Sequence, residues 1–409
     1  MVARQGQASA NGPRPPDRLA PGETVDVEIE RILPGGAGLA HARGQTVMVS
    51  LAAPGDRARV RVDRIRGTVA FASIVEIRVP SPARVVPRCR YFGRCGGCDF
   101  QQLSYEAQLA AKVDIIRDCL RRIARIDPPA ELTITGSPAA WGYRARAQWQ
   151  YDPGTKRLGY FARGTHEVCD VAECPVLVPS LQRALAGLRD RVPHEGLAAG
   201  AGEFQAAAGD DDVSLIPPCT PYLSREVVCT IGAERYRYDA ERFFQSNQAL
   251  LGPLIAAAAG TAAGEMALDL YCGVGLFTLP LARRFRRVVG VEADPPAVAY
   301  ARRNVRDAGL TNATIEESSV GQWLARHAVA HPQVDLALLD PPRSGAESET
   351  VQGLLAWRPR LISYVSCDPA TLARDLRRLI EGGYHLEQIA AFDLFPQTHH
   401  VEMVARLSR

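Results

Sequence analysis

The chain has 409 residues, of which 46% are hydrophobic and 23% are charged, and its formal net charge at pH 7 is +3. This length allows two or three hydrophobic cores, and no apolar run approaches the length of a membrane span. We expect a cytoplasmic monomer of several domains, not attached to a membrane, whose small net charge exerts no general attraction on nucleic acid.

The first 79 residues contain two different patterns. Residues 1–20 are rich in Gly, Pro, Ala and Arg and predict a disordered tail rather than a signal peptide. Residues 21–79 alternate apolar and polar side chains between glycine and proline turns, which predicts a small antiparallel β-barrel. Barrels of this size often bind oligonucleotides. Five arginines on the later strands form either a solvated face or an RNA contact: Arg57, Arg59, Arg61, Arg64 and Arg66.

A cysteine cluster interrupts this pattern. Cys89, Cys95 and Cys98 lie within CRYFGRCGGC, and such tight spacing in a cytosolic chain favours a metal site over disulfides. Cysteine-only ligands suit either an iron–sulfur cluster or zinc. A fourth ligand must come from elsewhere, and CDVAECPVL offers Cys169 and Cys174.

The middle of the chain reads as short strands and turns. We expect residues 80–100 and 136–238 to form a central domain that holds the metal site. We expect the remaining cysteines to be ordinary buried residues: Cys119, Cys219, Cys229 and Cys272.

Between these parts, residues 104–124 show a period of 3.6 residues, which predicts a helix capped by Ser104. From about residue 265, short apolar strands alternate with amphipathic helices. This alternation predicts a doubly wound α/β domain. We assign residues 101–135 and 239–409 to it.

The first strand of this domain runs into DLYCGVG. Gly273 and Gly275 permit a tight turn and close approach of a ligand, but Thr278 stands where a dinucleotide site would have a third glycine. The next strand ends in Glu292, which can accept hydrogen bonds from a ribose diol. The pattern favours a nucleoside cofactor without pyrophosphate, namely S-adenosylmethionine. The alternative is a structural turn beside a solvated Glu292.

Three further residues fall on the edge where ligands bind in such sheets. Asp340 ends one strand and begins DPPRSG, and Cys367 ends the next, directly before the helix cap Asp368-Pro369. The helix N-terminus is expected to favour the thiolate of Cys367. Glu402 starts the final strand, and it lies on the same edge if that strand is antiparallel to its neighbours. Each residue could instead be structural or solvated.

A thiolate and a carboxylate beside a methyl donor suggest one reaction. Uracil C5 is a poor nucleophile, but addition of a thiolate at C6 turns C5 into an enolate carbon that can attack the sulfonium methyl group. A base must then remove the C5 proton before the thiolate is eliminated. Cys367 and Glu402 could fill these two roles, and no metal is needed.

Seven motifs together resemble those of the RNA uracil-C5 methyltransferases, which make 5-methyluridine in rRNA and tRNA: CRYFGRCGGC, FFQSNQ, DLYCGVG, GVEAD, DPPRSG, SCDPATLARDL and HHVEM. The resemblance covers nearly the whole chain after the tail. It implies a class I, Rossmann-like catalytic domain, with Cys367 as nucleophile and Glu402 as base. The family's donor and target pocket would map to Gln245, Tyr271, Glu292 and Asp340.

The resemblance also bears on the remaining parts of the chain. It implies that residues 21–79 form an RNA-binding TRAM domain and that the helix at 104–124 packs with the catalytic domain. The fourth cysteine ligand would be Cys174, completing a [4Fe–4S] site with Cys89, Cys95 and Cys98. A TRAM domain together with these cysteines favours the 23S rRNA branch over the tRNA branch.

One departure and two alternatives remain. Many family members have Asn where this chain has Leu276, so that contact to the cofactor is in doubt. An amino-group methyltransferase can also carry a D-P-P motif, but it would not need Cys367. A non-catalytic iron–sulfur RNA-binding protein would need neither Cys367 nor Glu402.

Overall fold

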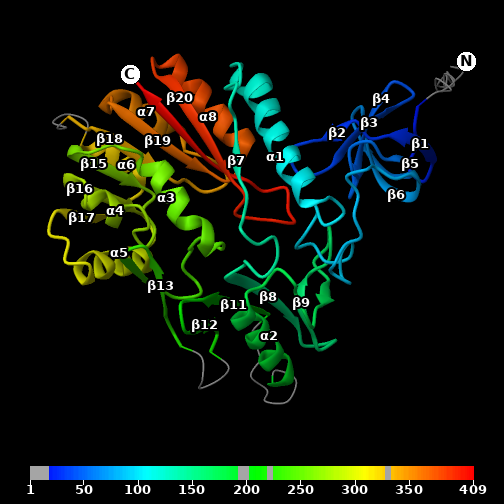
Figure 1. The fold of residues 1–409 in the computed structure, drawn as a ribbon, viewed down its shortest axis with the longest axis horizontal. Helices are drawn as coiled ribbons and strands as arrows, with labels where there is room; N and C mark the ends of the chain where they lie inside the picture. The colour runs from blue at the N-terminus through cyan, green and yellow to red at the C-terminus, as the bar shows by residue number, and fades with distance from the viewer. Residues whose placement is uncertain (1–17, 192–201, 219–223, 328–332) are drawn as a thin grey trace, which may run out of the picture. The chain divides into compact units, whose positions relative to one another are not determined.

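The computed structural model describes residues 18–191, 202–218, 224–327 and 333–409. The chain divides into two compact units, Met1–Arg84 and Val85–Arg409 (Figure 1). The predicted tail lies outside the described residues as far as residue 17. The predicted boundary of the tail at residue 20 is too far along the chain, because Leu19 is 3% exposed and belongs to the core of the first unit.

The first unit is a six-stranded sheet in the order β1-β5-β6-β4-β3-β2. Its strands are β1 (Thr24–Glu28), β2 (Arg31–Ile32), β3 (Gly38–Ala42), β4 (Gln45–Ser50), β5 (Arg57–Arg66) and β6 (Val69–Val79). The prediction of an antiparallel structure was wrong at one place, since β4 and β6 run parallel. The residues between β4 and β5 carry the chain across the sheet, so that β4 meets β6 rather than β5. Alternate valines fill the core.

Most of the charge on the arginine-rich strands of this unit is neutralised. Three of the five arginines form ion pairs with carboxylates: Arg57 with Glu28, Arg59 with Asp26 and Arg61 with Asp63. Arg64 lies over the ring of Phe71, 4.5 Å from its centroid. The ion pairs agree with the solvated face, and the alternative of an RNA contact stays a hypothesis.

The second unit contains an eight-stranded sheet in the order β17-β16-β15-β18-β19-β21-β20-β7. The strands of its parallel part are β15 (Gly264–Leu270), β16 (Phe285–Glu292), β17 (Ala313–Glu317), β18 (Leu336–Leu339) and β19 (Leu361–Ser366). The final strands are β20 (His385–Phe392) and β21 (Glu402–Ser408), and β21 is antiparallel to both of its neighbours. The connecting helices are α3 (Leu251–Ala259), α4 (Thr278–Ala282), α5 (Pro295–Asp307), α6 (Val320–Arg326), α7 (Ser348–Trp357) and α8 (Pro369–Glu381). The predicted doubly wound α/β fold is confirmed.

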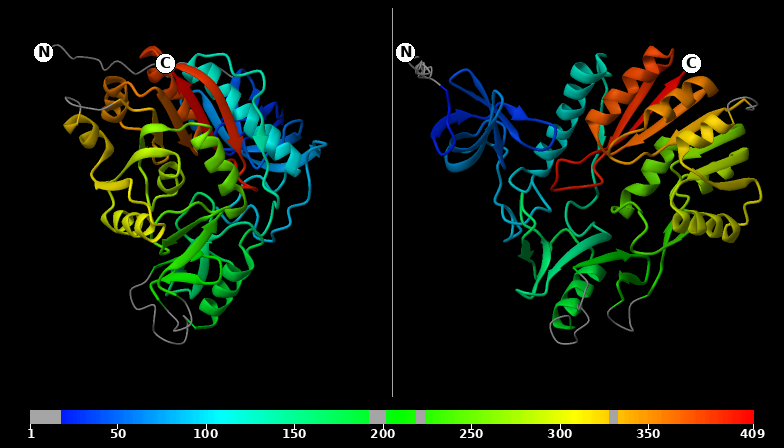
Figure 2. Two further views of the ribbon diagram at one scale, coloured as in Figure 1. Left: turned by 60° about the vertical axis from the view of Figure 1, so that its left-hand side comes forward. Right: turned by 180° about the vertical axis from the view of Figure 1, so that it is seen from behind.

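An early part of the chain completes this sheet. Helix α1 (Tyr105–Cys119) is capped by Ser104, whose side chain accepts a hydrogen bond from Ala107 N, and it continues into a π-helical turn, η1 (Leu120–Ala124). Helix α1 and η1 pack against α8, and β7 (Ile134–Thr135) pairs with β20. Figure 2 shows α1 beside these C-terminal elements from two further directions. The predicted packing of this helix with the α/β sheet is therefore observed.

A second, five-stranded sheet in this unit has the order β10-β9-β8-β11-β12. Its strands are β8 (Arg146–Asp152), β9 (Arg157–Phe161), β10 (Val168–Asp170), β11 (Glu203–Ala208) and β12 (Val213–Ile216), and a hairpin of β13 (Val227–Ile231) and β14 (Glu234–Tyr238) follows. Helix α2 (Pro179–Arg191) was missed in the sequence analysis, although Leu181, Leu185 and Leu188 form one buried face at helical spacing. A short 3-10 turn, η2 (Gln248–Leu250), precedes α3. The division of this unit into a central and a catalytic domain stays a prediction.

Among the described residues, no helix is both long enough and apolar enough to span a membrane.

Candidate active site

Two predicted catalytic residues meet at one edge of the eight-stranded sheet. Cys367 directly follows β19, and Glu402 is the first residue of β21. Because β19 and β21 are antiparallel and Ser366 pairs with Met403, the next position in this register sets Cys367 opposite Glu402. The predicted orientation of the final strand is therefore confirmed.

The carboxyl group of Glu402 is buried without a hydrogen-bond partner for one oxygen. Its side chain is 1% exposed, and within the described part of the chain Oε2 has no partner. Burial, and then the charge of Asp340, raises the pKa of Glu402 well above its usual value, while Arg343 acts in the opposite direction. A buried acid of this kind holds its proton strongly, as expected of a general base or acid in a site that excludes water.

Asp340 is a second, partly buried acid beside Glu402. It follows β18, and its pKa is raised by burial to about 7, although a hydrogen bond from the Gln245 amide lowers it. Gln245 is itself buried, and among the described residues its Oε1 has no partner. The site thus contains unsatisfied polar atoms on Gln245 and Glu402. Such atoms are the ones expected to hydrogen-bond a polar ligand.

The thiol of Cys367 is not activated in the way that we predicted. Burial, and then the charge of Glu402, raises its pKa to about 12, with Arg343 opposing the shift. Asp368 does cap α8 as predicted, accepting hydrogen bonds from Ala370 N and Thr371 N, each at 2.9 Å. Removal of the thiol from water, together with the nearby carboxylates, therefore favours its neutral form.

The glycine-rich turn after β15 is held in a left-handed conformation. The φ angles of Tyr271, Gly273 and Gly275 are 63°, 53° and 96°. Glu292 Oε2 accepts a hydrogen bond of 3.0 Å from Gly273 N, and Oε1 accepts from the two backbone N–H groups that follow it. Glu292 thus fixes the turn, and Oε2, which accepts one hydrogen bond, retains a lone pair for a ligand, whereas Oε1 already accepts two.

Tyr271 makes polar contacts with α7, whereas the side chain of Leu276 is packed among apolar residues. The Tyr271 hydroxyl contacts Glu347 and lies 3.0 Å from Thr350 Oγ1 on α7. Leu276 is 8% exposed and packs in the hydrophobic core, and its carbonyl accepts a hydrogen bond from Tyr236. The side chain of Leu276 accordingly offers no hydrogen-bonding group at the position where the resemblance leads us to expect Asn.

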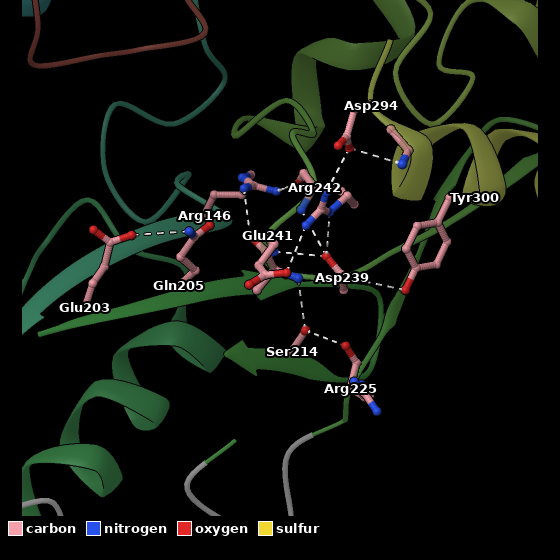
Figure 3. Close-up of polar contacts among 12 residues, drawn as sticks. Arg146, Glu203, Gln205, Ser214, Arg225, Asp239, Glu241, Arg242, Asp294 and Tyr300 are labelled. Atoms are coloured by element: carbon pink, nitrogen blue, oxygen red, sulfur yellow. Dashed lines mark hydrogen bonds and ion pairs between the residues drawn. The ribbon is translucent and has the colours of Figure 1, made fainter. Parts of the chain in front are cut away.

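Arginines that sequence reasoning did not identify hold the segment before Gln245. Arg146 on β8 donates hydrogen bonds to the carbonyls of Ala240 and Arg242, and Arg242 in turn donates to Asp294 Oδ2 at 2.8 Å. Figure 3 shows Arg146, Arg242 and Asp294 converging on this segment. Asp294 caps α5 two residues after Glu292. The same contacts therefore connect the segment before Gln245 to the segment that carries Glu292. GYRARAQ contained no signal for this role.

The loop that carries Asp340 and Arg343 is fixed by side chains of β19 and α8. Ala346 N donates hydrogen bonds to the Tyr364 hydroxyl and to Asp375 Oδ2, each at 3.0 Å, and the tyrosine donates to the same carboxylate. Asp375 is fully buried. Arg343 was also missed, although it lies within DPPRSG, because a single arginine in a loop has no periodic signature.

The four cysteines predicted as metal ligands line one cavity of about 70 Å³ in the second unit, with Arg144 and Tyr160. Their sulfurs are free thiols, and Gly97 N lies 3.4 Å from Cys95 Sγ. Burial raises the pKa of Cys95 to about 11 and of Cys98 to about 12, and the other thiols add to both shifts. In the described ranges, no three His, Cys, Asp or Glu side chains already form a group that could hold a metal ion.

The remaining cysteines are buried where they can be described. Cys169 is 7% exposed and packs against Tyr91 and Val171, beside Cys89, Cys95 and Cys174. Cys119, Cys229 and Cys272 are buried, as predicted. Cys219 lies outside the described residues.

Comparison with known proteins gives two family matches. A model described as tRNA (Uracil-5-)-methyltransferase matches residues 221–409, and a TRAM domain model matches residues 18–75. A Methylococcus capsulatus protein named 23S rRNA (uracil(1939)-C(5))-methyltransferase is 33% identical, over 95% of this chain and 98% of its own. The chain belongs to the RNA uracil-C5 methyltransferase family.

Further relatives of this methyltransferase agree. A Pseudomonas putida protein of the same name is 33% identical, over 97% of this chain and 96% of its own. The crystal structure of Pyrococcus abyssi tRNA (uracil-54, C5)-methyltransferase in complex with S-adenosyl-L-homocysteine has a TM-score of 0.72 and 25% identity. It covers 93% of this chain and 100% of that one. The predicted resemblance to this family is confirmed.

Proposed function

We propose that this methyltransferase transfers the methyl group of S-adenosylmethionine to C5 of a uridine in 23S rRNA. The observation that carries the chemistry is the placement of Cys367 opposite the buried Glu402 carboxyl group, one oxygen of which has no hydrogen-bond partner among the described residues. The choice of RNA is supported by the relatives named for 23S rRNA, which match nearly their whole length. The tRNA-modifying P. abyssi enzyme is less similar in sequence.

In the proposed reaction, the Cys367 sulfur bonds to uracil C6 and the resulting enolate carbon C5 attacks the methyl group of the sulfonium. The methyl–sulfur bond breaks and S-adenosylhomocysteine leaves. Glu402 then takes the C5 proton, and elimination of the Cys367 thiolate restores the C5–C6 double bond. Because burial raises the pKa of Cys367 to about 12 and that of Glu402 well above its usual value, both groups must release a proton to solvent before the reaction, Cys367 to attack C6 and Glu402 to accept the C5 proton. Arg343 would favour the thiolate, since its charge lowers the pKa.

The donor would bind along the turn at Tyr271, Gly273 and Gly275, with Glu292 accepting from its ribose. This is supported by the positive φ angles of the turn and by the position of Glu292 at the end of β16. The uracil would be held by Gln245 and Asp340, because Gln245 hydrogen-bonds Asp340 and the charge of Asp340 raises the pKa of both Cys367 and Glu402.

We also propose that Cys89, Cys95, Cys98 and Cys174 hold a [4Fe–4S] cluster. These thiols share one cavity, are not paired in disulfides, and lie beside the partly buried Arg144, whose charge lowers the pKa of Cys98 and Cys174. A cluster bound there would compensate the mutual repulsion of the thiolates. The methylation steps above require no electron, so the role of the cluster would be structural.

The test is to incubate the protein with S-adenosylmethionine and either unmodified 23S rRNA or tRNA, and to analyse the nucleosides by mass spectrometry. New 5-methyluridine in 23S rRNA alone, absent with Cys367→Ala, is the expected result. 5-Methyluridine in tRNA alone would correct the substrate. A methyl group on a base amino group, formed equally by Cys367→Ala, would refute the mechanism, and no change in either RNA would favour a binding protein.

A further inference from the structure

The loop that leads into Glu402 is held by a segment nearly 300 residues earlier in the chain. Residues 393–401 connect β20 to β21, and Glu402 is the next residue. Backbone N–H groups of Asp99 and Phe100 both donate to the carbonyl of Gln397, at 3.1 and 3.0 Å. The Asp99 carboxylate accepts from His399 N at 2.9 Å and also contacts the His399 ring nitrogen Nδ1.

A reciprocal amide pair fixes the middle of this loop. Gln397 N donates to Gln108 Oε1 at 2.8 Å, and Gln108 Nε2 donates to Gln397 Oε1 at 3.1 Å. Both side chains are buried. Gln397 has a φ of 69°, a left-handed conformation that is costly for a residue with a side chain and persists only where its surroundings impose it. The pair with Gln108 supplies that constraint.

The start of the loop is held by a buried ion pair. Lys112 Nζ lies 2.5 Å from Asp393 Oδ1 and also donates to the carbonyl of Phe395 at 3.1 Å. Both charged side chains are 0% exposed. Removing one partner would leave the other charge buried and unpaired, so the contact fixes one geometry strongly.

These contacts determine where Glu402 can point. Glu402 pairs with Phe392 at the very end of the β20–β21 ladder, and strand ends open first unless they are fixed from outside. Within the described residues, nothing hydrogen-bonds Glu402 Oε2 directly. The direction of this carboxyl group therefore depends on the loop and on the segment that holds it.

We propose that Asp99, Gln108 and Lys112 are positioning residues for Glu402, so that the segment after the cysteines belongs to the catalytic apparatus. Asp99 follows Cys98 directly, and Gln101 Oε1 accepts a hydrogen bond from Cys89 N at 3.1 Å. The same short segment thus contacts the cysteine cavity on one side and the loop before Glu402 on the other. The assignment rests on the proposed role of Glu402 as base.

The order of the chemical steps provides a specific test. Proton removal by Glu402 follows the formation of the sulfur–C6 bond and of the methyl–C5 bond. A misplaced base therefore slows the release of an RNA that is already covalently attached to Cys367. Denaturing gels of enzyme mixed with S-adenosylmethionine and RNA measure this attached fraction, and hydrogen exchange measured by mass spectrometry reports whether residues 393–401 are loosened.

Asp99→Ala should lower kcat about tenfold and raise the fraction of RNA attached to Cys367 several-fold. The KM for S-adenosylmethionine should stay unchanged, and hydrogen exchange in residues 393–401 should become faster. Asp99→Asn, which can still accept from His399 N, should restore most of kcat. Asp114→Ala is the matched control, because Asp114 lies on the exposed face of α1 and, among the described residues, forms an ion pair with Arg117 alone. The attached band must disappear when Cys367→Ala is added to the variant.

Other outcomes separate the possible failures. A fall in kcat without more attached RNA, or a rise in KM alone, would overturn the positioning role. If Asp99→Ala does not fold, Gln108→Ala removes both amide hydrogen bonds to Gln397 and must give the same pattern. If the wild-type protein makes no 5-methyluridine, the proposed function fails. In that case, hydrogen exchange in residues 393–401 that is equally fast in Asp99→Ala and in the wild type would separately refute the contact between Asp99 and this loop.

Discussion

Replacing Asp340 by Asn should stabilise the protein in a pH-dependent way. Burial raises the pKa of Asp340 from 3.8 to about 7, so ionisation costs about 4 kcal/mol more in the folded site than in the unfolded chain. The full cost applies above about pH 7, decreases as the pH falls, and vanishes below the unfolded pKa of 3.8. Asn carries no charge at any pH and still accepts a hydrogen bond from Gln245.

The stabilisation expected from Asp340→Asn is about 4 kcal/mol at pH 8 and about 2 kcal/mol at pH 5. For a unit of this size, 4 kcal/mol corresponds to a rise in Tm of roughly 6 °C. Thermal unfolding monitored by circular dichroism from pH 5 to pH 8 measures the difference. Asp114→Asn, whose carboxylate is 66% exposed, should change Tm little at either pH. An equal effect of Asp340→Asn at both pH values, or a lower Tm at pH 8, would refute the reasoning.

Three further variants test other parts of the site. Glu292→Ala should weaken binding of S-adenosylmethionine about tenfold, measured by calorimetry, because the turn loses the acceptor for its backbone N–H. Gly345→Ala should destabilise the protein to urea by about 1–3 kcal/mol, because φ is 80° and a Cβ would lie 2.6 Å from Asp375 Oδ2. Cys174→Ser should remove most of the bound iron from anaerobically purified protein, whereas Cys169→Ser should retain it.

Each of these three results has an outcome that contradicts it. Unchanged affinity in Glu292→Ala would mean that this carboxylate serves the turn without contributing to donor binding. Wild-type resistance of Gly345→Ala to urea would mean that the loop can shift away from Asp375. Equal iron in both cysteine variants would exclude Cys174 as a ligand, and loss of iron only in Cys169→Ser would exchange the two assignments.

The sequence predicted those parts of the site that depend on local patterns. The pair Asp368-Pro369 marks a helix start, so the position of Cys367 at a strand end could be deduced, and the antiparallel final strand then brings Glu402 opposite it. The ionisation of Cys367 could not be deduced. Burial raises the pKa of this thiol, and the burial of one thiol depends on side chains from distant parts of the chain.

The contacts that the sequence did not reveal are long-range and not periodic. The amide pair of Gln108 and Gln397 and the ion pair of Lys112 and Asp393 each join residues more than 280 positions apart. Polar residues in a helix predict a solvated face, so nothing marked Gln108 and Lys112 as buried. The parallel pairing of β4 with β6 was missed for a similar reason, because alternation predicts a strand but not its partner.

The buried pair of Lys112 and Asp393 has a consequence for the synthesis of the chain. Lys112 leaves the ribosome 281 residues before its only described carboxylate hydrogen-bond partner. During that interval its ammonium group must stay hydrated, so α1 cannot take its final place against the sheet. The eight-stranded sheet is likewise incomplete until β20 and β21 have been made, although β7 is translated much earlier. Final folding of this unit must therefore follow translation, and a chain truncated before Asp393 should expose α1 to proteases and chaperones.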